Sequence, residues 1–181
     1  MRMGGLQAQA LNVITALTPE AIHTTLDFQG TRKERLALSG DIRQWMEPVK
    51  TIQISKMTLT AFDQPPLVNQ GPVNVTLSPD RVSVDSLSLA SGPATLSGKG
   101  QARLTSPTEA SAALTLRDVD LSRISGFLAG GDKLKGRISS DIKLSGALNK
   151  PVIQMDMSLK EASFDKYAVS GAKASISYSD S

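Results

Sequence analysis

The sequence predicts a mainly β protein, an antiparallel β-meander with one or two short helices. Apolar and small polar residues alternate along most of the 181 residues, which is the period of a strand with one buried and one wet face. Turn residues separate these runs at regular intervals, as in Ser78-Pro79-Asp80 and Ser91-Gly92-Pro93. Aromatic residues are only 4% of the chain, so the large side chains that fill a thick core are scarce.

Taken in order, the chain reads as one β-repeat segment over residues 1–181. We expect a less regular start at 1–33, a first strand group at 34–119, a short helix at 120–130 and a second strand group at 134–181. Residues 6–23 fit neither the helical nor the strand period, and the pattern favours a strand followed by a short helical turn near Pro19. The chain stops directly after a strand-like run, which suggests a segment of a longer chain.

Period-two alternation marks the predicted strands. The runs cover residues 52–54 and 57–59, 73–77, 82–84 and 87–89, 112–116, 138–144, 153–159 and 172–178. In two of them the apolar parity switches, at Ser55-Lys56 and at Asp85-Ser86. Because a strand cannot change face without an extra residue, each switch predicts either a bulge or a short turn that splits two strands.

A Leu-Ser-Gly triplet occurs three times, beginning at Leu38, Leu96 and Leu144, and a proline follows each one: Pro48, Pro107 and Pro151. We expect the leucine to pack on the apolar face and the glycine to permit a bend or bulge. The proline is expected to stop pairing before the next strand begins.

One helix is predicted, over residues 120–129. Asp120 is a candidate N-cap, and Gly130-Gly131 would end the helix. Leu121, Ile124, Phe127 and Leu128 would share one face.

The composition excludes several classes of protein. There are no cysteines, which rules out disulfides and Cys-ligated metals. The net charge is +3 without a basic run, so nothing indicates nucleic acid, although weak attraction to anionic lipid is allowed. No stretch is long and apolar enough to span a bilayer, and the first residues have no secretion-signal pattern.

No catalytic or metal motif emerges. His23 is the only histidine and no Gly-x-Ser-x-Gly surrounds a serine, so we expect no enzyme and no cofactor. Asp118 and Asp120 lack further ligands at calcium-loop spacing and are interpreted as a loop and a helix cap. Residues 130–136 lack Gly-Lys-Ser/Thr and read as a turn. Trp45 is either an exposed partner contact or a residue packed over one end of the sheet.

Three stretches together resemble the repeats of the TamB/AsmA-like superfamily of bacterial envelope proteins. The stretch 134–153 contains a strand, two glycines, Pro151 and another strand, while 82–98 and 114–121 resemble two further patterns of those proteins. The resemblance extends over residues 34–181. It implies a long β-sheet curled into an elongated groove, taco-like or half-barrel in form, in the periplasm, with an N-terminal inner-membrane helix outside this segment.

The same resemblance implies partners. They are phospholipid acyl chains moving between the inner and outer membranes, an outer-membrane barrel protein whose assembly is supported, and flanking repeats of the same chain. An apolar groove can hold acyl chains without specific contacts, because each buried methylene contributes about 0.8 kcal/mol. The predicted groove-lining residues are Ile52, Ile54, Leu87, Leu89, Leu114, Leu116, Ile142, Leu144, Ile153, Met155, Met157 and Leu159.

An ordinary closed core is the alternative reading of those residues, because inward alternation looks the same in both cases. The protein would then be a structural or adhesive β-repeat module of a surface protein.

Overall fold

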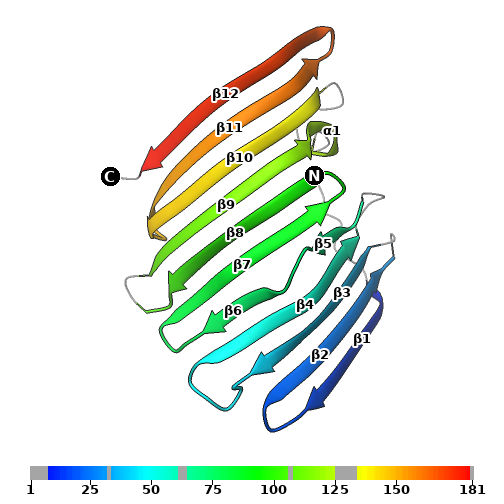
Figure 1. Ribbon diagram of the computed structural model, residues 1–181, viewed down its shortest axis with the longest axis vertical. Coiled ribbons are helices and arrows are strands. Elements are labelled where there is room, and N and C mark those ends of the chain that lie inside the picture. The colour runs from blue at the N-terminus through cyan, green and yellow to red at the C-terminus, as the bar shows by residue number, and fades with distance from the viewer. Residues whose placement is uncertain (1–7, 32–33, 61–64, 106–107, 125–133, 180–181) are drawn as a thin grey trace. The chain divides into compact units, whose positions relative to one another are not determined.

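The computed structural model describes residues 8–31, 34–60, 65–105, 108–124 and 134–179. Hydrogen bonding orders the strands as β1-β2-β3-β4-β5-β7-β8-β9-β10-β11-β12, with β6 beside β4 and β7 (Figure 1). Each pair with a defined register is antiparallel. The structure thus confirms the predicted mainly β, antiparallel meander. The chain divides into two compact units, Met1–Pro79 with Val84–Gly92, and Asp80–Ser83 with Pro93–Ser181.

Unit 1 contains β1 to β6 and most of β7. Their bounds are β1 Ala8–Leu17, β2 Ala21–Gly30, β3 Arg35–Arg43, β4 Lys50–Thr60, β5 Leu67–Asn69, β6 Val73–Leu77 and β7 Arg81–Ser91. β1 and β2 pair with each other along most of their length, with a register shift between Ala8 and Ala10. Near Pro19 the structure has no helical turn, so that prediction is wrong. The Thr18 amide donates to the Ala21 carbonyl at 2.8 Å, which closes a tight hairpin turn instead.

The predicted parity switch in β4 is a β-bulge. The register with β3 shifts between Ser39 and Gly40, which leaves Ser55 as the extra residue. Asn69 bridges this bulge with two hydrogen bonds. Its amide oxygen accepts from the Met57 amide at 2.7 Å, and its Nδ2 donates to the Ser55 carbonyl at 3.0 Å. At the second switch β7 runs unbroken across Asp85-Ser86, so no turn splits it there.

Unit 2 contains the first residues of β7 and five long strands. Their bounds are β8 Ala94–Arg103, β9 Glu109–Asp120, β10 Leu134–Ala147, β11 Lys150–Phe164 and β12 Tyr167–Ser179. Each strand pairs antiparallel with the next along the chain, and the connection between β9 and β10 contains the helix α1.

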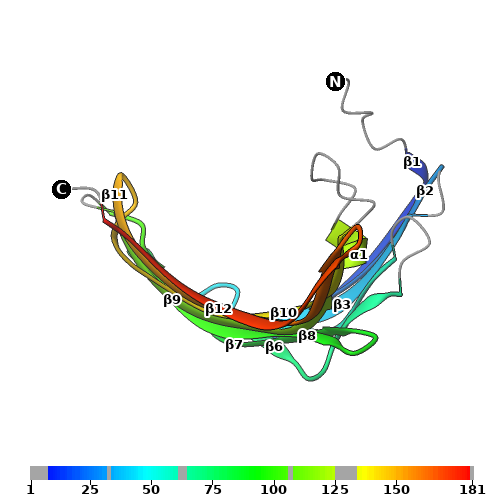
Figure 2. The same ribbon diagram turned by 90° about the horizontal axis from the view of Figure 1, so that it is seen from above.

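The strands of unit 2 are bowed along their length, as β9, β10 and β12 show in Figure 2. Two register shifts lie towards one end of this sheet, where Asp118 in β9 and Glu161 in β11 have positive φ angles of 52° and 51°. The Asp118 amide is satisfied by the Ser139 hydroxyl at 3.1 Å. Gly136 lies opposite the second bulge with φ +127°, where a Cβ would meet the Ala162 Cα at 2.8 Å. Bulges bend the strands that carry them, which accounts for the curvature.

The predicted helix is only partly within the described residues. α1 spans Leu121–Ile124, and the rest of the predicted range, with Phe127 and Leu128, lies outside them. Asp120 caps the turn as predicted, since its carboxylate accepts from the Ser122 amide at 2.9 Å. Leu121 is 5% exposed and α1 contacts β9 and β10, so this turn anchors one end of the sheet.

The Leu-Ser-Gly repeat has a less uniform role than its sequence predicts. Gly40 lies at the bulge opposite Ser55 and Pro48 precedes β4, as expected. Pro151, however, is the second residue of β11 and the register partner of Gly146, so it does not stop pairing. It is tolerated near a strand end because few ladder hydrogen bonds are lost there. Pro107 lies outside the described residues.

We predict that Gly98→Ala destabilises the protein. A Cβ at Gly98 would meet the Ala113 carbonyl at 2.7 Å and the Leu114 side chain at 2.5 Å, so β8 and β9 would have to separate. The expected loss is about 1–3 kcal/mol in the free energy of unfolding, measured by denaturant titration. Gly71→Ala is the matched control, because nothing lies within 4 Å of its Cβ, and it should change stability by less than about 0.5 kcal/mol. Equal losses in the two variants would contradict the packing argument.

Candidate functional site

The register of unit 2 collects its apolar side chains on one face. Ile142 pairs with Leu114 on one side and Met155 on the other, and Leu144 pairs with Ile153. Directly paired residues point to the same side of a sheet. The same face carries the register partners and the period-two neighbours of these residues: Leu96, Ala112, Leu116, Ile138, Met157, Leu159, Ala174, Ile176 and Tyr178.

This surface, named here the apolar face of unit 2, is crowded but not covered. Along β11 the side chains of Ile153, Met155 and Met157 are half-buried, whereas Gln154 and Asp156 on the other face are exposed. Along β11 the apolar face is therefore better packed than the opposite face.

No second layer of described residues packs on this face. The strands of unit 2 contact their neighbours in the sheet, and α1 contacts only its β9–β10 end. The buried hydrophobic residues described in unit 2 are Leu121 and Ala162, and no side chain in the described ranges is less than 2% exposed. A closed sandwich core would have produced fully buried leucines and isoleucines.

One polar side chain lies within this face. Ser140 is 4% exposed between Ile138 and Ile142 in β10, and its hydroxyl donates to the Asp156 carbonyl at 3.1 Å. The hydroxyl is therefore satisfied by the neighbouring strand and leaves the face effectively apolar.

Unit 1 also has one apolar face. Ile52 pairs with Ile42 and Val75, and Ile54 pairs with Val73. Leu89 is the register partner of Asn69, and Leu87 lies two residues before it on the same side. Leu89 at 7% and Val73 at 5% are the described buried hydrophobic residues here, so Leu89 is better packed than the other predicted lining residues.

The structure therefore brings the predicted residues together in two sets. Eight of them share the apolar face of unit 2: Leu114, Leu116, Ile142, Leu144, Ile153, Met155, Met157 and Leu159. The remaining four, Ile52, Ile54, Leu87 and Leu89, belong to unit 1. Sequence reasoning omitted Leu96 and Ile176, although the repeat triplet and the alternation at 172–178 were signals that could have included them.

The opposite face of unit 2 is held by cross-strand polar pairs. Arg117 in β9 donates to both carboxylate oxygens of Asp141 in β10, at 2.7 and 3.0 Å, and the Thr115 hydroxyl donates to the same carboxylate at 2.9 Å. These hydrogen bonds, that from Arg117 above all, hold the pKa of Asp141 below its usual range. Ser175 in β12 donates to Asp156 at 2.6 Å.

Unit 1 repeats this arrangement on its polar face. Arg35 donates to Asp27 at 2.7 Å, which lowers the pKa of that carboxyl. His23 Nδ1 lies 2.6 Å from Asp41 Oδ1 across β2 and β3, which gives the single histidine a structural partner.

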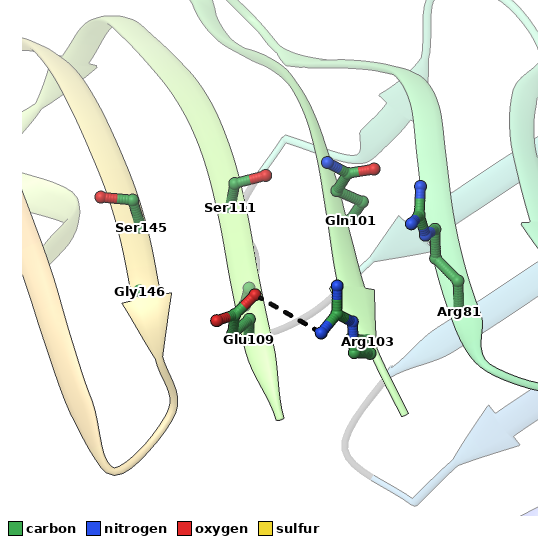
Figure 3. A pocket seen from close by; sticks show the side chains of 8 residues that line it. Arg81, Gln101, Arg103, Glu109, Ser111, Ser145 and Gly146 are labelled. Atoms are coloured by element: carbon green, nitrogen blue, oxygen red, sulfur yellow. Dashed lines mark ion pairs between the residues drawn. The ribbon is translucent and has the colours of Figure 1, made fainter. Parts of the chain in front are cut away.

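A shallow hollow of about 350 Å³ lies on the polar face of unit 2, near the strand ends (Figure 3). Arg81, Gln101, Ser111 and Ser145 line it, and an Arg103–Glu109 ion pair with atoms 3.9 Å apart crosses it. That pair is too long and too exposed to organise a catalytic site. Among the described residues no cluster of His, Asp and Glu could hold a metal ion.

No family model, curated protein or solved structure matches the chain. The TamB/AsmA-like family consequently remains a prediction from the repeat pattern. No helix within the described ranges has the length and apolar character to cross a membrane.

We predict that Arg117→Gln raises the pKa of Asp141 towards the ordinary value of about 3.9. A carboxyl whose pKa is lower in the folded state stabilises the fold above its unfolded pKa, and this contribution is lost as pH falls through the folded pKa. The variant should therefore lose stability at neutral pH but little at pH values below both pKa values.

A ¹³C NMR titration of the Asp141 carboxyl measures the shift directly, and denaturant unfolding at neutral and acid pH measures the linked stability. Lys99→Gln removes a cation from the same face without touching this pair and serves as the control. An unchanged titration midpoint in Arg117→Gln would contradict the assignment of the shift to this hydrogen bond.

Proposed function

We propose that the protein is a non-catalytic segment of a TamB/AsmA-like envelope protein, whose apolar sheet face shields phospholipid acyl chains. One observation carries this proposal: unit 2 has a contiguous apolar face spread over β8 to β12 that no other described element covers. Soluble proteins rarely leave so large an apolar surface without a function.

The chemistry of the face suits a hydrocarbon chain. Its side chains are aliphatic or thioether groups, apart from Tyr178 on the edge strand β12, and the polar side chain in its middle, Ser140, is already hydrogen-bonded. Contact along about five methylenes would contribute about 4 kcal/mol, which is enough to hold a lipid weakly and reversibly. Met155 and Met157 are flexible and adapt to occupants of differing shape. Such a face selects for acyl chains as a class.

The polar face supports the same function in a different way. Its ion pairs and hydroxyl contacts keep one side of the sheet wetted, so a lipid has only one side on which to bind. The headgroup would remain in water while the chains lie against the strands. A sheet of this kind needs no catalytic residue, because shielding is passive.

The edge strand β12 provides a means of joining flanking repeats. It pairs with β11 on one side, all thirteen of its residues are exposed, and no described strand pairs with its other side. A strand added there would extend the apolar face through Ile176 and Tyr178, which are 50% and 51% exposed. Periplasmic location, transport between membranes and an outer-membrane barrel partner are parts of the proposal that come from the resemblance.

We predict that the purified protein retains phospholipid and that three substitutions on the apolar face release it. Leu116→Asp, Ile142→Asp and Met155→Asp place three carboxylates where hydrocarbon would lie, and their desolvation opposes lipid binding. The matched control is Ser97→Asp, Gln154→Asp and Ser177→Asp, which adds the same charge to the polar face of the same sheet, on β8, β11 and β12. Mass spectrometry of organic extracts measures bound lipid, and circular dichroism measures folding.

Lipid present in the wild type and in the polar-face variant, but absent from a folded apolar-face variant, is the expected result. A lipid-free, well-folded wild type that also takes none from added vesicles would overturn the proposal. If the apolar-face variant unfolds, the single variant Met155→Gln and competition with a fluorescent fatty acid replace it.

A further inference from the structure

The strand β1 is an edge strand of unit 1. It pairs with β2 on one side, and no described strand pairs with its other side (Figure 1). Edge strands of soluble proteins are usually protected by charged side chains, prolines or covering segments. β1 contains no charged residue and no proline, and every residue from 9 to 17 is exposed. An edge with so little protection is suited to pairing with a further strand.

The hairpin turn between β1 and β2 fixes which backbone groups of β1 face outward. The Thr18 amide donates to the Ala21 carbonyl, so these two residues form a hydrogen-bonded pair. Such pairs alternate with non-hydrogen-bonded pairs along an antiparallel ladder, and residues of the second kind direct their N–H and C=O groups away from the partner strand. In β1 these outward-facing residues are Leu11, Val13, Thr15 and Leu17.

The side chains of β1 are apolar on both faces of the sheet. Leu11, Val13 and Leu17 lie on the apolar face of unit 1, because their register partners in β2 are apolar. Ile14 lies on the opposite, polar face beside Thr25. All four are between 51% and 63% exposed. A lipid on the apolar face could not cover Ile14, nor could its hydrocarbon pair with the outward-facing backbone groups. A further strand would do both.

We propose that β1 pairs with β1 of a second copy of this chain, antiparallel and about a two-fold axis at Ile14. Leu11 and Leu17 lie three positions to either side of that residue, so the strand has a symmetric pattern. In this register Leu11 faces Leu17 of the second copy and Val13 faces Thr15, all through outward-facing backbone groups. On the other face each Ile14 packs against its own symmetry mate.

The strand's own sequence identifies the second copy as the occupant. This register uses all four outward-facing residues and places no like charges opposite each other, since β1 carries no charge. A shift of the two-fold axis by one residue would put Leu17 against the irregularity at Ala8–Ala10, or Leu11 against the turn at Pro19. The pairing is also closed, because each β1 edge is covered by the other.

The expected dimer is weak. A single pair of strands buries less surface than a standard protein interface, so we expect a dissociation constant on the order of 10–100 µM. Antiparallel pairing keeps the apolar faces of both copies on the same side, so the dimer extends the apolar face of unit 1 across the two-fold axis. The inference goes beyond the proposed function and does not rest on lipid binding by unit 2.

Sedimentation equilibrium from about 5 to about 500 µM brackets this affinity. The average mass should rise from the monomer value of 19.2 kDa towards twice that value. Hydrogen exchange followed by NMR tests the register at the same time. The amides of Leu11, Val13, Thr15 and Leu17 should exchange rapidly in dilute protein and become protected in concentrated protein, because only dimerisation gives them acceptors on the outer edge.

A charge exchange at Ile14 tests the two-fold axis. Ile14→Lys and Ile14→Glu each place like charges opposite each other, so each variant alone should dimerise at least about tenfold more weakly. An equimolar mixture of the two variants places opposite charges there and should associate again. Val169→Lys, at a 50% exposed residue of the edge strand β12, is the control that should leave dimerisation unchanged. Circular dichroism measures folding of each variant.

Three results would overturn the inference. They are a monomer at all concentrations up to about 500 µM, no renewed association in the mixture of Ile14 variants, or association that Val169→Lys abolishes. The first would leave the β1 edge to a strand of a different protein, and the last would assign pairing to β12. If the Ile14 variants do not fold, Thr15→Pro replaces them, because its N–H faces outward and its loss removes no bond to β2. None of these readouts depends on whether unit 2 carries lipid.

Discussion

The backbone hydrogen-bond ladder between neighbouring strands is the interaction on which the rest of this protein depends. Neither unit has a closed core among the described residues, and only four hydrophobic residues there are buried: Val73, Leu89, Leu121 and Ala162. Stability that a globular domain draws from its interior must here come largely from paired strands and from side chains that touch across them. The stability of each strand therefore depends on its neighbours. Side chains that complete the pairing, such as Asn69 at the β4 bulge, matter for stability here as core packing does in a globular domain.

A single layer of strands has a direct functional consequence. With no second sheet among the described residues, the apolar side chains pack sideways against one another, and most of them remain partly exposed. The bulges at Asp118 and Glu161 bend the strands that carry them, and the apolar side chains beside them remain partly accessible. The polar pairs on the other face, such as Arg117 with Asp141, link neighbouring strands without occupying the apolar face. The cross-strand polar contacts and the proposed lipid-shielding role are thus divided between the two faces.

The sequence alone determined the strands and their faces, because a period of two is a local property. It predicted the Asp120 cap and either a bulge or a turn at Ser55-Lys56, and the residues that it proposed for a groove lie on apolar faces of the two units. It failed in β1, where Ile14 lies on the polar face beside Thr25 and disturbs the alternation, and at Pro19, where a hairpin replaces a helical turn. Only the tertiary structure decided which strands are neighbours, that Ile142 lies between Leu114 and Met155, and that Trp45 has a buried donor without a partner. These facts depend on register and on turns meeting in space, and local periodicity carries no information about either.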